Sequence, residues 1–171
     1  MQPATIVILD FGGQYAQLIA RRVRENHVHS LVVPFDVTLE QLKNHNAVGM
    51  IFSGGPSSVY SADAPKCRRD VLDSGLPILG ICYGLHLVCD MLGVDVTPST
   101  AREFGRTQLE VTDRDALLAH VPERTTVWMS HGDVVQEVSR DFAAVAIHST
   151  TAICCSVRSS ANGGPPVMFS H

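Results

Sequence analysis

Hydrophobic residues fall into short continuous runs that alternate with amphipathic segments along the first half of the chain. Four apolar runs predict strands, at residues 6–11, 31–35, 48–53 and 77–81. Apolar residues at helical spacing predict helices, at residues 14–25, 39–44, 65–74 and 83–92. Several of the strand runs are apolar on both faces, which is typical of strands that lie between two layers of helices. The alternation of strand and helix therefore predicts a parallel sheet covered by helices.

The second half of the chain is richer in strands and has little helical pattern. The predicted strands there are residues 108–112, 126–130, 143–147 and 152–157. A turn-rich stretch, SSANGGPP, follows at residues 159–166, and residues 167–169 begin a further strand shortly before the sequence stops. We expect a single α/β domain over residues 1–171, truncated at its C-terminus. Its central sheet should be open and mostly parallel, with helices on both faces.

Composition and charge exclude several classes of function. The chain has 171 residues, 45% of them hydrophobic and 18% charged, as in ordinary globular domains. Its formal charge is −4 and it has no basic stripe, so neither nucleic acid nor a membrane is an expected partner. No apolar run is long enough to span a membrane, and the N-terminus lacks the pattern of a secretion signal. The five cysteines show no metal-ligand spacing, which predicts a cytoplasmic protein without a metal site.

The stretch LGICYGLH at residues 79–86 contains the strongest candidate for chemistry. An apolar strand runs directly into a helix there, and Cys82 occupies the junction with a glycine two residues away on each side. This pattern is typical of a nucleophile elbow, in which one residue is held in a strained turn. The thiol would lie at a helix N-terminus, where the helix dipole favours the thiolate. The alternative, a structural cysteine buried in an apolar element, explains Cys89, Cys154 and Cys155 but not the flanking glycines.

Five motifs, in order along the chain, resemble one family. GICYG at residues 80–84 is similar to the nucleophile motif of class I glutamine amidotransferases, and SGGP at 53–56 is similar to a loop of that superfamily. DFGGQYAQLIARRVRE at 10–25, REFG at 102–105 and VWMSHGD at 127–133 resemble the glutaminase domain of the GMP synthetase family. The resemblance implies the flavodoxin-like architecture of class I glutamine amidotransferases. Arg102 and Glu103 are expected to support the site from a neighbouring loop.

The resemblance also implies a glutaminase in which Cys82 attacks the side-chain amide of glutamine and forms a thioester. It implies that the backbone N–H groups of Gly55 and Tyr83 stabilise the charge on the attacked carbonyl oxygen. A four-residue segment at the end of a predicted strand is implied to hold the amino-acid end of the substrate. That segment consists of Ser130, His131, Gly132 and Asp133. Taken alone, this segment and the glycine loop are typical of surface turns.

In the GMP synthetase family, the ammonia passes to a synthetase domain, an ATP pyrophosphatase, which aminates xanthosine monophosphate to GMP in purine biosynthesis. The resemblance therefore implies that the substrate is glutamine and that the partner is a synthetase, present as a domain or as a separate subunit. The sequence contains no glycine-rich pyrophosphate-binding loop. We therefore expect ATP and magnesium only in that partner and no cofactor in this domain.

Two positions depart from the family pattern. His86 stands where the family has a glutamine that contacts the substrate, so it is either a replaced substrate contact or an ordinary residue on the same helix face as Cys82. The family completes its triad with V-Q-F-H-P-E, whereas this sequence ends in VMFSH. The candidate base is His171, displaced by one position, unless Ser170 occupies the histidine position and the base is lost. The glutamate that would orient the imidazole is absent.

These departures leave hypotheses from two classes. The first is the glutaminase part of a GMP synthetase, which uses Cys82 to release ammonia. The second is an impaired amidotransferase-like module that binds a ligand or partner without releasing ammonia. A glutaminase part of another class I amidotransferase is a further alternative, against which the motifs at residues 10–25 and 127–133 argue.

Overall fold

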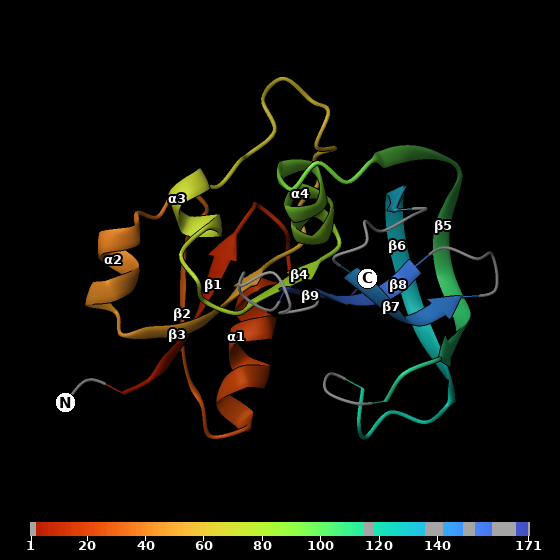
Figure 1. Cartoon of the computed structure of the whole chain (residues 1–171), viewed down its shortest axis with the longest axis horizontal. Coiled ribbons are helices and arrows are strands. Elements are labelled where there is room, and N and C mark those ends of the chain that lie inside the picture. The colour runs from red at the N-terminus through yellow and green to blue at the C-terminus, as the bar shows by residue number, and fades with distance from the viewer. Residues whose placement is uncertain (1–2, 115–117, 136–141, 149–152, 159–166, 171) are drawn as a thin grey trace.

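The computed structural model describes residues 3–114, 118–135, 142–148, 153–158 and 167–170. Within these residues one sheet contains nine strands (Figure 1). The strands are β1 Thr5–Asp10, β2 His29–Pro34, β3 Ala47–Phe52, β4 Ile78–Ile81, β5 Val96–Val111, β6 Arg124–Val135, β7 Phe142–His148, β8 Ile153–Arg158 and β9 Val167–Ser170. The helices are α1 Ala16–Glu25, α2 Leu39–Asn44, α3 Arg69–Leu72 and α4 Tyr83–Met91.

The sheet has a parallel half and an antiparallel half. Its strand order is β2-β1-β3-β4-β9-β8-β7-β5-β6. The first five strands of this order run parallel to one another, and every later pairing is antiparallel. The predicted α/β fold, an open and mostly parallel sheet in its first half with helices around it, is confirmed. Strand β9 joins the halves, because it pairs in parallel with β4 and antiparallel with β8.

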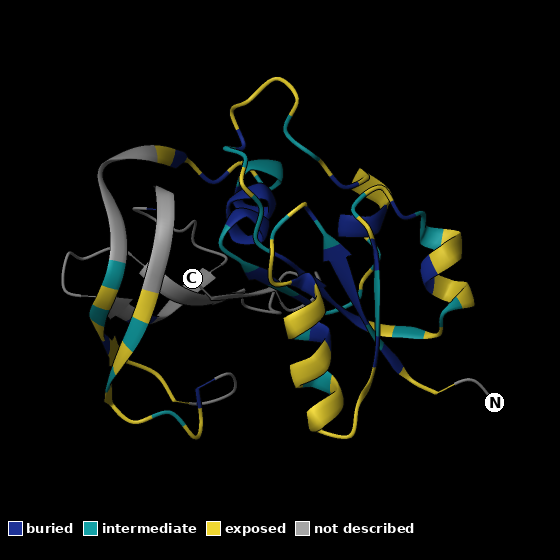
Figure 2. Ribbon diagram, turned by 180° about the vertical axis from the view of Figure 1, so that it is seen from behind, coloured by how far each residue is buried: buried dark blue, intermediate teal, exposed yellow. Residues whose placement is uncertain are grey.

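Alternate side chains of β1 enter two different cores. Ile8 packs with Ala16 and Ala20 of α1 on one face of the sheet. Leu9 points to the other face, where it belongs to a larger cluster that includes Leu87 of α4. Since successive side chains of a strand point to opposite faces, both faces of the parallel half are covered. Figure 2 shows the central strands and α4 as buried, whereas α1 exposes its outer side.

Two helices show how local sequence sets their ends. Helix α2 begins with a capping box, in which the Thr38 side chain accepts from the Gln41 N–H and the Gln41 side chain accepts from the Thr38 N–H. Helix α3 is much shorter than the predicted segment 65–74, because the backbone remains extended up to Arg68, with φ −71° and ψ 143°. The helix prediction is therefore wrong for residues 65–68 and 73–74.

Strands β5 and β6 are longer than the apolar pattern predicted, and they pair along most of their length. Arg102 and Glu103, expected in a loop, lie inside β5, so that expectation is wrong. Among the described residues, no helix has both the length and the apolar character needed to cross a bilayer.

Candidate active site

Cys82 occupies the junction between β4 and α4 in a strained backbone conformation. Strand β4 ends at Ile81, helix α4 begins at Tyr83, and Cys82 between them has φ 49° and ψ −114°. Residues other than glycine rarely adopt positive φ, at a cost of about 1–3 kcal/mol, and such strain is concentrated at functional sites. The side chain is only partly buried. The strained turn predicted from the spacing of the glycines is thus observed.

The two flanking glycines allow strand and helix to approach closely. A Cβ atom on Gly80 would lie 2.8 Å from the Cα of Leu85, and one on Gly84 would lie 2.7 Å from the Cβ of Phe52 and overlap the Phe52 carbonyl oxygen. Real Cβ atoms do not approach other atoms so closely. The glycines at these positions therefore let α4 begin directly against β3 and β4.

The glycine loop that follows β3 lies beside the thiol. A Cβ on Gly54 would lie 3.6 Å from the Cβ of Cys82, which is ordinary contact distance. A Cβ on Gly55 would lie 2.7 Å from the carbonyl oxygen of Phe11 and 3.4 Å from the ring of Tyr83. The structure therefore brings together Cys82, Tyr83 and the loop, as the sequence predicted for the nucleophile and its two amide donors.

Two backbone N–H groups next to Cys82 remain available for a ligand. Within the described part of the chain, the N–H groups of Gly55 and Tyr83 donate no hydrogen bond. The N–H of Gly84, the next residue of α4, instead donates to the carbonyl oxygen of Ser53 at 3.1 Å. Free N–H groups at a helix N-terminus are suited to bind a negatively charged oxygen. The oxyanion-hole prediction requires free N–H groups of this kind, and the role of these two groups in binding an oxyanion stays a prediction.

The side chain of Tyr83 ties the start of α4 to its surroundings. Its ring lies 5.5 Å from that of Phe11 at the end of β1, measured between ring centroids. Its hydroxyl donates to the carbonyl oxygen of Pro65 at 2.6 Å. Burial, with a smaller contribution from the nearby Asp90 charge, raises the pKa of Tyr83 to about 12. The phenol therefore stays protonated and acts as a fixed donor across the physiological range.

The environment of Cys82 disfavours the thiolate in the isolated domain. Burial raises the pKa of the Cys82 thiol above its ordinary value. The helix dipole, which was expected to favour the thiolate, therefore does not decide the protonation state. Burial raises the pKa of Cys67 and of Cys89 further, to about 12, as expected for inert thiols in a core. Cys82 needs a base to act as a nucleophile near neutral pH.

The segment implied to hold the substrate lies within a strand and not after one. Strand β6 continues to Val135, so Ser130, His131, Gly132 and Asp133 are all part of it, and the prediction that they follow the strand end is wrong. The reason is pairing with β5, in which His131 lies opposite Glu103. Val135, at the end of β6, packs in the same core cluster as residues of α4. The role of the segment in binding substrate stays a prediction.

His86 is part of the buried body of α4. It is 4% exposed, and its backbone N–H donates to the carbonyl oxygen of Cys82 at 3.1 Å. Every residue from Tyr83 to Cys89 in this helix is buried. This burial favours an ordinary helix residue over an exposed substrate contact, and the role of His86 in binding stays a prediction.

The last described strand leads toward the elbow. Strand β9 pairs in parallel with β4, and its final residue, Ser170, lies opposite Ile81, which immediately precedes Cys82. The candidate base, His171, follows Ser170 directly but lies outside the described residues. The end of β9 therefore lies beside the end of β4, which leads directly into the nucleophile. The sequence alone did not establish that these two strands are neighbours.

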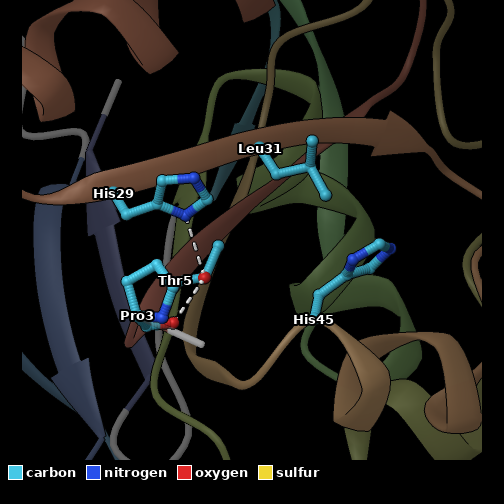
Figure 3. A pocket seen from close by; sticks show the side chains of 5 residues that line it. All are labelled: Pro3, Thr5, His29, Leu31 and His45. Atoms are coloured by element: carbon cyan, nitrogen blue, oxygen red, sulfur yellow. Dashed lines mark hydrogen bonds between the residues drawn. The ribbon is translucent and has the colours of Figure 1, made fainter. Parts of the chain in front are cut away.

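Cys82 lines neither of two hollows in the surface. One, of about 330 Å³, is lined by Pro3, Thr5, His29, Leu31 and His45 (Figure 3). It lies where β1 and β2 begin, at the edge of the sheet opposite to Cys82, and Thr5 Oγ1 there lies 3.0 Å from His29 Nδ1. The other, of about 500 Å³, lies beside the ends of β1 and β2. In the described part of the chain, no cluster of three or more His, Cys, Asp or Glu side chains is arranged to hold a metal ion.

A strained cysteine between a parallel strand and a helix, faced by a glycine loop with a free amide, is typical of a class of cysteine-dependent amide hydrolases. The family model of glutamine amidotransferase class I matches residues 7–165. The chain belongs to the class I glutamine amidotransferase family, and the predicted family is confirmed.

Curated relatives narrow the similarity further. A GMP synthase [glutamine-hydrolyzing] of Campylobacter jejuni subsp. doylei is 44% identical over 154 residues, which are 90% of this chain and 30% of the relative. The enzyme of the same name from Caldanaerobacter subterraneus is 46% identical over 142 residues, 83% of this chain and 28% of the relative. The chain therefore spans less than a third of the length of these relatives.

Solved structures share the fold over the whole chain. A crystal structure of a protein from Thermoplasma acidophilum, described as a GMP synthase subunit, has a TM-score of 0.82 and is 26% identical. The match covers 99% of this chain and 83% of that one. A glutamine amidotransferase of Thermotoga maritima has a TM-score of 0.74 at 16% identity, covering 99% of this chain and 75% of that chain, and shows the fold alone.

Proposed function

We propose that this chain hydrolyses glutamine through a thioester on Cys82. The observation that carries the proposal is the strained Cys82 at the start of α4, with the free N–H groups of Tyr83 and Gly55 beside it. Membership of the class I glutamine amidotransferase family supports glutamine as the substrate. The same geometry supports the nucleophile and the two donors that the sequence indicated.

The reaction needs four changes in bonding. A base takes the proton of the Cys82 thiol, and the sulfur attacks the side-chain amide carbon of glutamine. The carbonyl oxygen becomes negatively charged and accepts hydrogen bonds from Tyr83 and Gly55 N–H, each typically worth about 10²–10³ in rate. Ammonia leaves with the proton returned by the base, and a thioester remains. Water then hydrolyses the thioester to glutamate and restores the thiol.

The base in this proposal is His171. Support comes from β9, whose last residue pairs with Ile81 directly before the nucleophile. The segment Ser130, His131, Gly132 and Asp133 is proposed to hold the amino-acid end of glutamine, because β6 reaches the core cluster around α4. His86 contacts the substrate only if glutamine reaches its side chain, which is buried in the helix layer.

The ammonia is proposed to serve a synthetase that converts xanthosine monophosphate to GMP, with ATP and magnesium bound by that partner and not by this domain. The support is the similarity to GMP synthases about three times as long as the aligned region. The Thermoplasma acidophilum structure shows a domain of this fold as a separate chain, so the partner can be either a fused domain or another polypeptide. A cytoplasmic location follows from this role as part of the proposal.

The decisive experiment combines labelling with ammonia release. The chain is incubated with a glutamine analogue that carries a diazoketone, and the adduct is located by peptide mass spectrometry. We expect one adduct, on Cys82, and glutamine-dependent ammonia release that Cys82→Ala reduces by about 10⁴-fold or more. The matched control is Cys89→Ala, since Cys89 is a buried thiol on the same helix and should be dispensable for both signals.

The outcomes separate the two classes of function. An adduct on Cys82 without ammonia release would support the impaired binding module, in which the elbow is intact and the base is lost. No adduct on a folded chain would contradict the proposal. The raised pKa of Cys82 adds a check with simple alkylation. Because only the thiolate reacts, the rate should rise with pH and level off at a higher pH than for an exposed cysteine.

A further inference from the structure

Ser53, which directly follows β3, uses all of its hydrogen-bonding groups at the candidate site. Its side chain is 0% exposed. Its backbone N–H donates to the Leu9 carbonyl oxygen at 3.1 Å, and its carbonyl oxygen accepts from the Gly84 N–H at 3.1 Å. One residue therefore links the end of β1, the end of β3 and the second residue of α4.

The hydroxyl of Ser53 makes the two bonds that matter for the glycine loop. Its Oγ accepts from the Phe11 N–H at 3.2 Å, and its O–H donates to the carbonyl oxygen of Gly54 at 3.0 Å. A hydroxyl has one proton to donate, so the bond to Gly54 uses it. The carbonyl oxygen of the Gly54–Gly55 peptide is thereby held at one end by a buried donor.

The direction of that carbonyl determines the direction of the Gly55 N–H. The Gly54 oxygen lies against the backbone of Gly13, in the loop after β1, where a Cβ would overlap it. Strand β3 lies between β1 and β4, so this oxygen is on the β1 side and Cys82 is on the β4 side. In a trans peptide the N–H and the C=O point in opposite directions, and this peptide is trans. The Gly55 N–H therefore faces the side of Cys82.

A hydrogen bond to the Gly54 carbonyl oxygen is needed because the backbone of two glycines does not by itself select one orientation of the peptide. Two consecutive glycines have no Cβ to restrict their backbone dihedrals, so local sterics alone do not fix the orientation of the Gly54–Gly55 peptide. After such a rotation, the carbonyl oxygen and not the N–H would face the thiol. A carbonyl in that place would repel the developing oxyanion instead of stabilising it.

We propose that Ser53 is a positioning residue that locks the Gly54–Gly55 peptide in the orientation that presents the Gly55 N–H to Cys82. The inference rests on the proposed glutaminase function, and it deepens that function by naming the group that keeps one oxyanion donor in place. Ser53 touches neither the substrate nor the reacting atoms in this role. It acts through the hydrogen bond to the Gly54 carbonyl oxygen.

The test compares wild type with Ser53→Ala by two kinetic readouts and one structural readout. Acylation of Cys82 by a γ-glutamyl ester depends on the oxyanion donors, and Ser53→Ala should slow it by about 10²-fold. The main loss should be in kcat, with KM nearly unchanged. Alkylation by iodoacetamide forms no oxyanion, so its rate should stay the same. In the crystal structure of the variant, the Gly54 carbonyl oxygen should have left its place against Gly13.

Two further variants keep the test decisive. Ser53→Thr retains the hydroxyl and should restore both the acylation rate and the orientation of the peptide. If Ser53→Ala does not fold, because the Phe11 N–H loses its acceptor, Ser53→Cys replaces it as a nearly isosteric change. A thiol is too weak a donor to hold the Gly54 carbonyl oxygen as the hydroxyl does, so acylation should be slowed in this variant too. The circular dichroism melting curve of each variant checks the fold.

The possible failures can be told apart. A Ser53→Ala or Ser53→Cys variant that acylates at the wild-type rate, with its Gly54 carbonyl oxygen unmoved, would overturn the positioning role. A wild-type chain that is not acylated at all would contradict the proposed function. In that case, the orientation of the peptide in the variant's crystal structure alone decides whether Ser53 holds it.

Discussion

The two halves of the sheet differ in the packing of the side chains that the structure describes. In the parallel half, β1 to β4 are packed on both faces, and the larger core includes fully buried residues such as Phe52 and Leu87. In the antiparallel half, the described core is a small cluster of Leu109, Val111, Leu118 and Ala146. Trp128, on β6, is 70% exposed.

The difference shows where a strained residue can be maintained. Cys82 keeps its positive φ between a strand and a helix that lie closely together, since a Cβ on Gly80 or Gly84 would overlap backbone atoms of Leu85 or Phe52. Around Leu109 and Trp128 the described residues form only a small cluster and an exposed face, so substitutions there should be better tolerated. The loss of unfolding free energy on substitution should therefore be largest in the parallel half and smallest on the exposed side of the antiparallel half.

The largest effect is expected from removing a buried leucine in the parallel half. Leu87→Ala creates a cavity in the larger core and should lower the free energy of unfolding by about 4 kcal/mol. Leu109→Ala, in the small cluster, should cost about 2 kcal/mol, because its surroundings can close around the gap. Urea unfolding followed by circular dichroism measures both, and equal losses would contradict the proposed difference between the halves.

A somewhat smaller loss of stability is expected from placing a side chain where α4 lies directly against β3. Gly84→Ala places a Cβ where the Phe52 carbonyl oxygen lies, and it should cost about 3 kcal/mol in the free energy of unfolding. Gly54→Ala is the matched control on the neighbouring loop, because its Cβ would meet Cys82 at 3.6 Å and the Ile81 carbonyl oxygen at 3.9 Å, both ordinary contact distances. The control should change stability by less than about 1 kcal/mol. A similar loss in both variants would show that close packing is not the cause.

The strain at Cys82 itself should be measurable. Cys82→Gly removes the cost of the positive φ, whereas Cys82→Ala keeps a Cβ in the same conformation. The glycine variant should therefore be more stable than the alanine variant by about 1 kcal/mol, after allowing for the greater flexibility of an unfolded glycine. Melting temperatures of the two purified variants test this, and a more stable alanine variant would mean that the turn is not strained.

The smallest effect is expected on the outer side of the antiparallel half. Trp128→Ala removes a largely exposed side chain and should change the free energy of unfolding by no more than about 0.5 kcal/mol. Trp128 is the single tryptophan of the chain, so circular dichroism must replace fluorescence as the probe. A loss of about 2 kcal/mol or more would show that this face is packed more firmly than its exposure indicates.

The parallel half was predictable from sequence because its strands are apolar on both faces. The predicted strands 6–11, 31–35, 48–53 and 77–81 lie within two residues of β1 to β4 at each end. The antiparallel strands β5 and β6 were predicted too short. The stretches by which β5 and β6 exceed the prediction contain polar residues, and β5 also contains Pro98 and Gly105. These residues interrupt the apolar pattern, although the two strands continue to pair.

At the candidate site, the sequence predicted what depends on neighbours along the chain. The turn at Cys82 follows from glycines two residues away, and it is observed. The structural role of Ser53 was not predicted, because it depends on β1 lying beside β3 and on a hydrogen bond to the Phe11 N–H. Its only sequence signal was its place before the two glycines of the SGGP loop.

The position of β9 determines how late the sheet can be completed while the chain is being synthesised. Residues 167–170 lie in the middle of the sheet, between β4 and β8, although they come far along the chain. A ribosome releases β1 to β4 and the whole elbow well before β9, so during synthesis β4 presents an unpaired edge. The nucleophile is thus made early and its neighbouring strand late, and the growing chain carries an open sheet edge in the interval.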